Sequence, residues 1–374
     1  MSFFVAILIW YGLIYLIFTY CEFWKNEPKK KDLLMDILLV SPLIIFASFR
    51  NNFQYMGDTY IYVSKIEDLP TNILDFFYYL CERTEPLTYI IMYVAKILFN
   101  SVHFVLFVLA LCFVVPWCVF YRKYSYNYKF CMFLFLAGGY YFSWCCNGIR
   151  QGLAMVVCAF MVPLVIEKKY WEAVLLGLCA FLLHNSAIMF FPFLYLCLGK
   201  MLNKKVLITI VCFIFLFFYF NDVVSYIFGK FGTEEGYSGT LNYYLDGAKL
   251  NLISLCFQSI PAIYSIISYS KIKKCKAPII NLCVNMSLIG VMFNVLAVMG
   301  GTSTFGRVAA YFTVFNYLLI PWLIDNTLEN RKLKITFTVI FVILFLIYYA
   351  FNLGPNLLLE EHIPVRPIIE FFKL

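Results

Sequence analysis

The sequence predicts an all-α, polytopic integral membrane protein, and three observations lead to that fold class. Hydrophobic residues make up 63% of the 374-residue chain and charged residues only 13%, and the mean hydropathy is +0.83. Uncharged stretches approach the roughly 20 residues that an α-helix needs to cross a bilayer. Runs such as 206–220 and 335–350 are apolar on every face, unlike the alternating strands of a membrane barrel. Their backbone must therefore hydrogen-bond within helices.

The apolar runs predict about twelve transmembrane helices (about 11–13) in a single membrane-embedded domain, residues 1–374. We expect them at residues 3–23, 33–49, 102–121, 130–146, 149–166, 172–187, 188–201, 206–221, 250–269, 277–299, 307–325 and 335–351. The first run has no basic residue ahead of it and a lysine-rich stretch behind it. It therefore reads as an uncleaved anchor with its N-terminus outside the cell.

Two longer segments between these runs are expected to be outer loops, residues 50–100 and 221–249. Within the first, residues 86–100 are apolar enough to enter the membrane, but a full span there would move the basic residues at 122–129 to the outside. We therefore expect a re-entrant or interfacial helix, which protein can bury at membrane depth. The second loop is rich in glycine and tyrosine and predicts either a lid or an ordinary solvated loop.

The charge distribution supports this topology and excludes several functions. Lysine clusters such as 29–31, 204–205 and 271–276 fall in alternate, inside loops, so the net charge of +8 follows the positive-inside rule and does not indicate nucleic-acid binding. Most of the 14 cysteines stand singly in apolar runs, and no metal-ligand spacing occurs. A P-loop is also absent. We therefore expect neither a metal nor another cofactor.

Six polar residues fall on the expected outer side of the membrane, four of them at the ends of spans and two in the outer loop 50–100. An ionisable group at the edge of a bilayer is costly to keep. Arginine offers a planar fork of donors that suits phosphate, and carboxylates and histidine can move protons. Each also has a structural interpretation: arginines reach for lipid headgroups, an aspartate forms a turn or helix cap, a glutamate complements a helix N-terminus, and a histidine satisfies a buried polar contact. The six residues are Arg50, Asp58, Glu85, Arg150, His184 and Arg307.

The sequence around these residues resembles the EpsG family, a branch of the Wzy-type bacterial polysaccharide polymerases. Nearly the whole chain takes part, and the combination of Asn-Gly-Ile-Arg-Gln with His-Asn-Ser is its most specific part. The segments that carry the resemblance are Phe49-Arg50, Gly57-Asp58-Thr59-Tyr60, Glu85-Pro86-Leu87, Asn147-Gly148-Ile149-Arg150-Gln151-Gly152-Leu153-Ala154, His184-Asn185-Ser186-Ala187 and Gly306-Arg307-Val308-Ala309-Ala310-Tyr311-Phe312.

The resemblance implies an enzyme, an inverting glycosyltransferase that polymerises undecaprenyl-diphosphate-linked oligosaccharide units. The reaction would take place at the outer face of the bacterial cytoplasmic (inner) membrane and yield O-antigen, capsule or exopolysaccharide. Membrane lipid, a flippase and a chain-length regulator are the partners it implies, with no nucleic acid. We expect Arg50, Arg150 and Arg307 to bind the diphosphate, because its developing charge needs stabilisation.

The acceptor hydroxyl needs a base, for which His184, Asp58 and Glu85 are the candidates. His184 is preferred, because related transferases use a histidine there and Asp58 is close enough in sequence to orient Arg50. We expect four further residues to support the site, namely Asn147, Gln151, Ser186 and Tyr311.

Two other enzyme or transport classes fit the same composition. A lipid-linked oligosaccharide flippase or transporter would also need arginines for phosphate, but it should show internal repeats and a polar path to both faces, and the sequence shows neither. A transferase that adds single sugars from a polyprenyl phosphate would carry a paired-acid motif in its first outer loop. Glu67-Asp68 is present there, and a surface turn explains it as well. A non-enzymatic scaffold is the third alternative.

Overall fold

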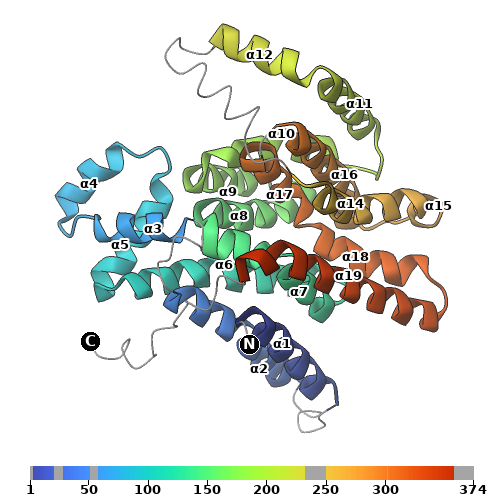
Figure 1. Ribbon diagram of the computed structural model, residues 1–374, viewed down its shortest axis with the longest axis horizontal. Helices are drawn as coiled ribbons and strands as arrows, with labels where there is room; N and C mark the ends of the chain where they lie inside the picture. The colour runs from blue at the N-terminus through green and yellow to red at the C-terminus, as the bar shows by residue number, and fades with distance from the viewer. Residues whose placement is uncertain (1–2, 21–27, 51–57, 232–249, 301, 358–374) are drawn as a thin grey trace. The chain divides into compact units, whose positions relative to one another are not determined.

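A computed structural model describes residues 3–20, 28–50, 58–231, 250–300 and 302–357 (Figure 1). Throughout these ranges the regular elements are helices. The chain divides into two compact units, each described here by itself. The first unit comprises Met1–Phe160, Leu175–Asn185 and Phe341–Leu374, and the second comprises Met161–Val174 and Ser186–Ile340.

Most of the helices of the first unit come from the N-terminal part of the chain. The unit also takes the first part of α8 (Ile149–Ile166), the last part of α9 (Tyr170–Leu183) and the end of α19 (Arg331–Leu357). Its other elements are α1 (Phe3–Tyr20), α2 (Pro28–Phe49), α3 (Thr59–Glu67), α4 (Ile73–Cys81), α5 (Pro86–Phe99), α6 (Val102–Tyr124), α7 (Tyr128–Ala137) and the π-helical turn η3 (Phe142–Asn147).

The core of the first unit is the antiparallel packing of α2 on α6. Near one end Arg122 forms an ion pair with Asp36, and near the other the carbonyl of Ser48 lies 2.8 Å from His103 Nδ1. Between these two contacts the helices bury apolar residues completely, and Trp117 of α6 is one of them. The shorter helices α3, α5 and α7 pack against α6 of this pair.

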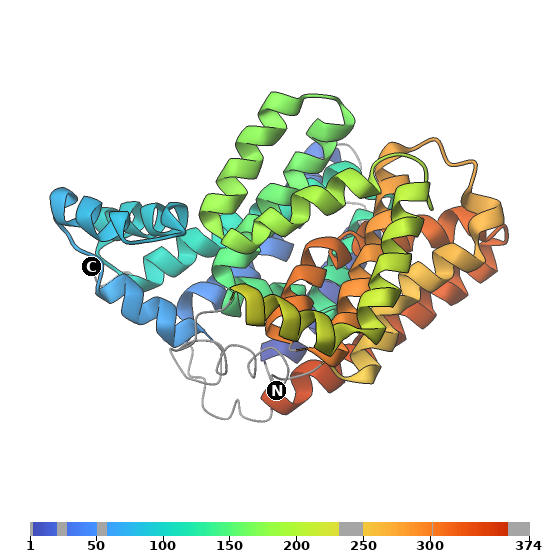
Figure 2. The ribbon, with the colours of Figure 1, turned by 90° about the horizontal axis from the view of Figure 1, so that it is seen from above.

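The first expected outer loop is folded into three helices rather than one. α3 and α4 precede α5, and both pack against α5; Figures 1 and 2 show the three lying side by side. The expected helix over 86–100 corresponds to α5, which starts with Pro86 and ends at Asn100 in a left-handed conformation with φ 43°. The second expected loop, 221–249, begins as the helix α12 (Phe220–Phe231). Its remaining residues, 232–249, lie outside the described residues.

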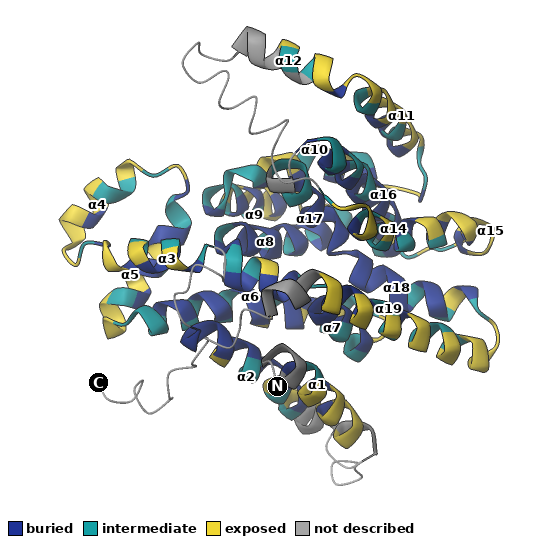
Figure 3. Ribbon diagram, viewed as in Figure 1, coloured by how far each residue is buried: buried dark blue, intermediate teal, exposed yellow. Residues whose placement is uncertain are grey.

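The second unit is built around α16 (Pro278–Met299), which is buried along most of its length (Figure 3). Asn285 Nδ2 donates to the carbonyls of Cys197 and Lys200 at 2.8 and 3.0 Å. These two hydrogen bonds join α16 to the end of α10 and to the segment that follows it. The unit's other elements are η4 (Asn185–Met189), α10 (Phe190–Cys197), α11 (Lys204–Phe218), α12, α14 (Leu252–Ile267), α15 (Tyr269–Ile272), the π-helical turn η5 (Thr302–Gly306), α17 (Arg307–Thr313) and α18 (Asn316–Thr327).

The described residues contain five helices that are long and apolar enough to cross a membrane, or six if the pair Thr304–Thr313 and Asn316–Thr327, bent by 45°, is one span. The five are Asp32–Phe49, Val102–Tyr124, Ile149–Ile166, Pro278–Met299 and Arg331–Phe351. These helices confirm a helical polytopic membrane protein. They do not support the expected number of about twelve.

The difference in number arises where the expected spans are interrupted. The apolar run at 130–146 forms α7 and then η3, because Gly138 and Gly139 break it and Gly139 takes φ +77°. The runs at 172–187 and 188–201 become α9, η4 and α10, each under 18 residues long. A helix of 14 residues rises only about 21 Å, less than the hydrocarbon thickness of a bilayer.

Apolar side chains cover much of the outward surface of both units. On α11, for example, Ile208, Val211 and Phe218 expose more than 60% of their area, and the exposed side chains of α19 include Val339 and Phe351 (Figure 3). Large exposed apolar areas are rare on soluble proteins. These surfaces are what helices in contact with lipid require.

Candidate functional site

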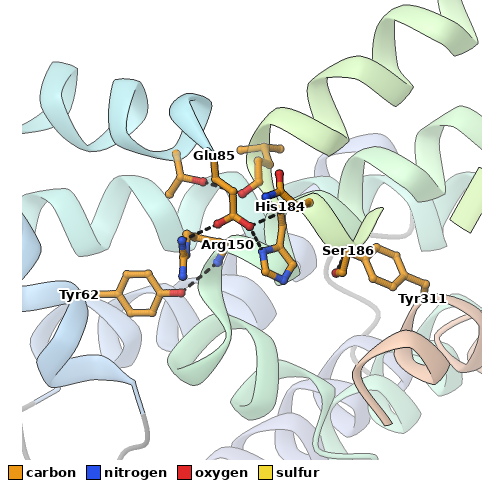
Figure 4. A network of polar contacts seen from close by, with 9 residues as sticks. Tyr62, Glu85, Arg150, His184, Ser186 and Tyr311 are labelled. Atoms are coloured by element: carbon orange, nitrogen blue, oxygen red, sulfur yellow. Dashed lines mark hydrogen bonds and ion pairs between the residues drawn. The ribbon is translucent and has the colours of Figure 1, made fainter. Parts of the chain in front are cut away.

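Glu85 is the centre of a polar network in the first unit (Figure 4). Its side chain is 7% exposed, and its two oxygens take different partners. Oε2 lies 2.5 Å from Arg150 Nη1, and Oε1 lies 2.6 Å from His184 Nδ1. The backbone N–H of Asn185 also donates to Oε1, at 3.0 Å. Three of the six residues expected to form the site are therefore in contact.

The position of Glu85 explains why its carboxylate is available to these partners. Glu85 is the residue before α5, but its side chain does not cap that helix. Pro86 takes the first helical position, where a missing N–H is tolerated. Thr88 Oγ1 then donates to the carbonyl of Leu183 at 3.2 Å. This contact joins the start of α5 to the end of α9, so Glu85 points at His184 instead of complementing its own helix.

His184 follows the last residue of α9, and its backbone N–H still donates to Ala180 at 3.0 Å. The ring contacts Glu85 through Nδ1, and Nε2 faces away from the carboxylate (Figure 4). The described residues give Nε2 no hydrogen bond, and the side chain is 17% exposed. A carboxylate on Nδ1 favours the tautomer whose Nε2 is a free acceptor. This arrangement suits a general base.

Arg150 lies in the first turn of α8, directly after η3. Its backbone N–H donates to the Tyr62 hydroxyl at 3.4 Å, and its side chain reaches Glu85. Glycines on either side allow the chain to pass close to Trp144: a Cβ at Gly148 would lie 2.8 Å from the indole, and one at Gly152 would collide with the Trp144 carbonyl. The glycines of the Asn-Gly-Ile-Arg-Gln-Gly motif are therefore required by packing, and they set the position of Arg150.

The network holds Glu85 in its ionised form. Burial alone would raise the pKa of this carboxyl, but the hydrogen bonds from His184 and Asn185 and the attraction of His184 and Arg150 outweigh it and lower the pKa below the ordinary value. The opposite holds for Tyr62, whose pKa is raised because burial outweighs the attraction of Arg150. Glu85 is thus an acceptor of hydrogen bonds and Tyr62 remains a neutral hydroxyl.

A second polar group in the first unit surrounds Arg50, which is 1% exposed. Arg50 Nε donates to Thr59 Oγ1 at 3.0 Å, Nη1 donates to the Ala47 carbonyl, and Nη2 lies 3.4 Å from the Cys146 carbonyl. Thr59 Oγ1 donates in turn to Cys146, at 2.7 Å. The donors of Arg50 are therefore bonded to protein oxygens, and they join α2 and α3 to η3.

Asp58 and Asn147 meet at the edge of this second group. The backbone N–H of Asp58 donates to Asn147 Oδ1 at 2.8 Å, so Asn147 holds the start of α3. The Asp58 carboxylate itself does not cap α3, and it is partly exposed. Gln151 is buried one residue after Arg150. α3 therefore connects the two groups, since it carries both Thr59 and Tyr62.

The remaining expected residues belong to the second unit. Ser186 Oγ lies 3.0 Å from the buried Tyr311 hydroxyl, which links η4 to α17. Arg307 is the first residue of α17, directly after the π-helical turn η5, and it is partly exposed. Each of these three residues lies at the start or within the first two turns of a short helix.

The structure adds three residues to those expected from the sequence. Asn185 was within the His-Asn-Ser motif, so the motif already pointed to it. Thr59 likewise stands beside Asp58 in the Gly-Asp-Thr-Tyr motif. Tyr62 lies four residues after Asp58 with no distinctive signal, and only the folding of residues 59–67 into α3 brings it to Arg150. No three His, Cys, Asp or Glu side chains of the described residues meet as metal ligands.

Comparison with known proteins places the chain in a family. No curated protein and no solved structure matches it significantly. The family model of the EpsG family matches residues 33–356, most of the chain, and that range contains every residue of the two polar groups. The family is associated with polysaccharide polymerase-like proteins. The chain therefore belongs to the EpsG family.

Proposed function

We propose that this protein is a polysaccharide polymerase, an inverting glycosyltransferase that joins undecaprenyl-diphosphate-linked oligosaccharide repeat units. The observation that carries the proposal is the contact of one buried carboxylate, Glu85, with both His184 and Arg150. A histidine oriented by a carboxylate is a base, and the neighbouring arginine is a cation at any physiological pH. Membership of the EpsG family and the apolar helices support the same reading.

In this proposal His184 Nε2 takes the proton of the acceptor hydroxyl, which belongs to the non-reducing sugar of one lipid-linked unit. The hydroxyl oxygen attacks the anomeric carbon of the donor glycan and forms the new glycosidic bond. The bond from that carbon to the diphosphate oxygen breaks, and its electron pair leaves with the lipid diphosphate. Attack from the face opposite the leaving group inverts the anomeric centre.

Glu85 acts in this scheme as a positioning residue rather than as a competing base. Its carboxylate fixes the His184 ring through Nδ1 and stabilises the imidazolium that forms when Nε2 is protonated. Its ionised state suits that role, because its lowered pKa keeps the negative charge in the neutral range. His184 is then the proton acceptor, and Asp58 is assigned to binding the acceptor sugar.

The leaving diphosphate needs cations at the position where its charge develops. Arg150 and Arg307 are the proposed residues for that role. Arg50 is proposed to support the fold of the site instead, because its donors are bonded to Thr59, Ala47 and Cys146. Asn147, Gln151, Ser186 and Tyr311 are proposed to hold the surrounding helices and to contact the sugar units.

The proposed setting is the outer face of the bacterial cytoplasmic membrane, and the product is O-antigen, capsule or exopolysaccharide. This orientation is the one expected from the sequence, in which the lysine clusters lie on the inside. A flippase that delivers the substrate and a regulator of chain length are proposed partners.

The test uses the full-length protein reconstituted in vesicles with a lipid-linked repeat unit. A ladder of products that differ by one repeat unit is the expected result. Addition of one sugar from a polyprenyl phosphate would show a single-sugar transferase, and movement of the substrate across the bilayer with no new glycosidic bond would show a transporter. Either of these outcomes in place of a ladder contradicts the proposal.

A further inference from the structure

Two basic side chains beside the Glu85 network have no role in the reaction described above. Lys65 lies in the last turn of α3, and Arg83 lies in the turn between α4 and α5, two residues before Glu85. Both belong to the first unit and approach the same aromatic ring, that of Tyr89. Tyr89 is buried, so this ring brings together two cations from different elements.

The contacts define the geometry of this group. The Arg83 guanidinium carbon lies 4.2 Å from the ring centroid of Tyr79 and 5.7 Å from that of Tyr89, and Lys65 Nζ lies 6.0 Å from the centroid of Tyr89. Arg150 also interacts electrostatically with Tyr89. Two cations therefore lie against one tyrosine ring, and Arg150, which contacts Glu85, is near enough to act on that tyrosine electrostatically.

Lys65 and Arg83, unlike Arg150, are not paired with a described carboxylate. No described carboxylate lies within 4.0 Å of Lys65 or Arg83. The buried Nε of Arg83 has no hydrogen-bond partner among the described residues. Asp68 is near enough to act on Tyr79 electrostatically, but the hydrogen bond that it makes is to Ser64, whose Oγ donates to Asp68 Oδ2 at 3.4 Å. The two acids nearest to Arg83 in the sequence are Glu82, which is exposed, and Glu85. Glu85 is already paired with Arg150 and His184.

Another arginine of the same unit shows what a purely structural stack looks like. Arg122 lies 4.2 Å from the centroid of Tyr128, the same distance as Arg83 from Tyr79. Arg122, however, is also paired with Asp36 and Asp32, so its charge is compensated by protein. Arg83 has the same aromatic contact without the acids. The buried Nε of Arg122 also lacks a hydrogen-bond partner among the described residues, so the difference between the two arginines is the missing carboxylate pair. An anionic ligand would supply that missing charge.

We propose that Arg83 and Lys65, together with Arg150, form an anion subsite that binds the diphosphate of the lipid-linked donor. The two tyrosine rings partly desolvate the Arg83 guanidinium, and a guanidinium binds phosphate in a bidentate manner. The assignment of the anion as a prenyl diphosphate rests on the proposed function. The subsite itself rests on the approach of Lys65 and Arg83 to one tyrosine ring and on the absence of a described carboxylate beside either of them.

The test measures binding without polymerisation. The full-length protein in nanodiscs of neutral lipid is titrated with farnesyl diphosphate, a short prenyl diphosphate, and the Kd and melting temperature are recorded. R83Q is expected to raise the Kd about tenfold or more with a melting temperature within about 2 °C of the wild type, and K65Q to raise it about threefold. K123Q is the matched control, because Lys123 also faces a tyrosine ring, at 5.1 Å, and it should leave the Kd unchanged.

Further arms identify the source of the phosphate. Inorganic diphosphate should compete with farnesyl diphosphate in the wild type and lose this effect in R83Q. If phosphatidylglycerol nanodiscs abolish the binding of farnesyl diphosphate, the subsite belongs to a lipid headgroup and the donor assignment is overturned.

An R83Q protein that binds farnesyl diphosphate like the wild type overturns the subsite itself, whether or not its melting temperature falls. Binding that depends on Arg83 in a protein that forms no ladder would leave the subsite standing and refute the polymerase. The two hypotheses therefore fail by different measurements.

Discussion

Glu85 and His184 are 99 residues apart in the sequence, yet Glu85 Oε1 lies 2.6 Å from His184 Nδ1. The contact depends on the start of α5 packing at the end of α9, where Thr88 bonds to the Leu183 carbonyl. It directs Nε2 of the histidine away from the carboxylate (Figure 4). Glu85 makes its second contact, through Oε2, with Arg150.

The substitution Glu85→Gln should lower the polymerisation rate about 10²-fold or more, because the amide keeps the shape but loses the charge that stabilises a protonated His184. The measurement is the initial rate of ladder formation by purified, reconstituted protein. Glu82→Gln is the matched control, since Glu82 is an exposed residue at the end of α4, and it should retain the wild-type rate. Equal rates for the two variants would remove Glu85 from the site.

The stability that Glu85 contributes should depend on pH in one direction. Because its folded-state pKa is below the ordinary value of 4.5, its contribution is fully present above about pH 4.5 and is lost as the pH falls through the lower folded-state value. The difference in melting temperature between wild type and Glu85→Gln should therefore be constant at neutral pH and shrink in acid. A difference that grows as the pH falls would contradict the assigned charge.

Arg150→Lys should remove most of the activity, about tenfold or more, although the positive charge is retained. A lysine ammonium cannot reproduce the planar fork of donors that reaches Glu85 and that is proposed to bind the diphosphate. Arg122→Lys is a close control, because the Arg122 side chain is 32% exposed and paired with Asp36, and the Arg150 side chain is 30% exposed and paired with Glu85. Near-normal ladders from a well-expressed Arg150→Lys protein would show that the reaction does not need the planar fork of Arg150.

Gly152→Ala should destabilise the protein by about 1–3 kcal/mol, because the added methyl group collides with the Trp144 carbonyl and forces the start of α8 to move. The melting temperature should fall because of the collision. The polymerisation rate should fall too, since Arg150 is in the same turn of α8. Gly12→Ala serves as the control, because nothing lies within 4 Å of its added Cβ. A Gly152→Ala protein as stable and active as Gly12→Ala would contradict the packing described for this motif.

The helices that could be predicted from the sequence are those whose apolar runs are long and uninterrupted. The expected spans 102–121, 149–166 and 277–299 correspond to α6, α8 and α16 within a few residues, because hydrophobic length determines such helices. The run at 130–146 was apolar enough to be taken as one helix. The positive φ of Gly139 ends α7 early, and hydropathy carries no information on that backbone choice.

The candidate site could be predicted as a set of residues but not as a set of contacts. The sequence identified Glu85, Arg150 and His184, while their pairing depends on the packing of α5, α8 and α9. Arg50 illustrates the limit most clearly. As an arginine at a helix end it suggested a phosphate ligand, but folding of residues 59–67 into α3 buries it against Thr59. Burial by residues that are distant in the sequence leaves no pattern in the local sequence from which it could be predicted.

The most direct test of the account is ladder formation by His184→Ala with a lipid-linked repeat unit. His103→Ala is its control, because Nδ1 of His103 is bonded to the Ser48 carbonyl, away from Glu85. We predict that wild type and His103→Ala form ladders, and that His184→Ala forms none while it still binds farnesyl diphosphate. A His184→Ala protein that polymerises at more than about a tenth of the wild-type rate would contradict the account, since a general base contributes roughly 10²–10⁴-fold.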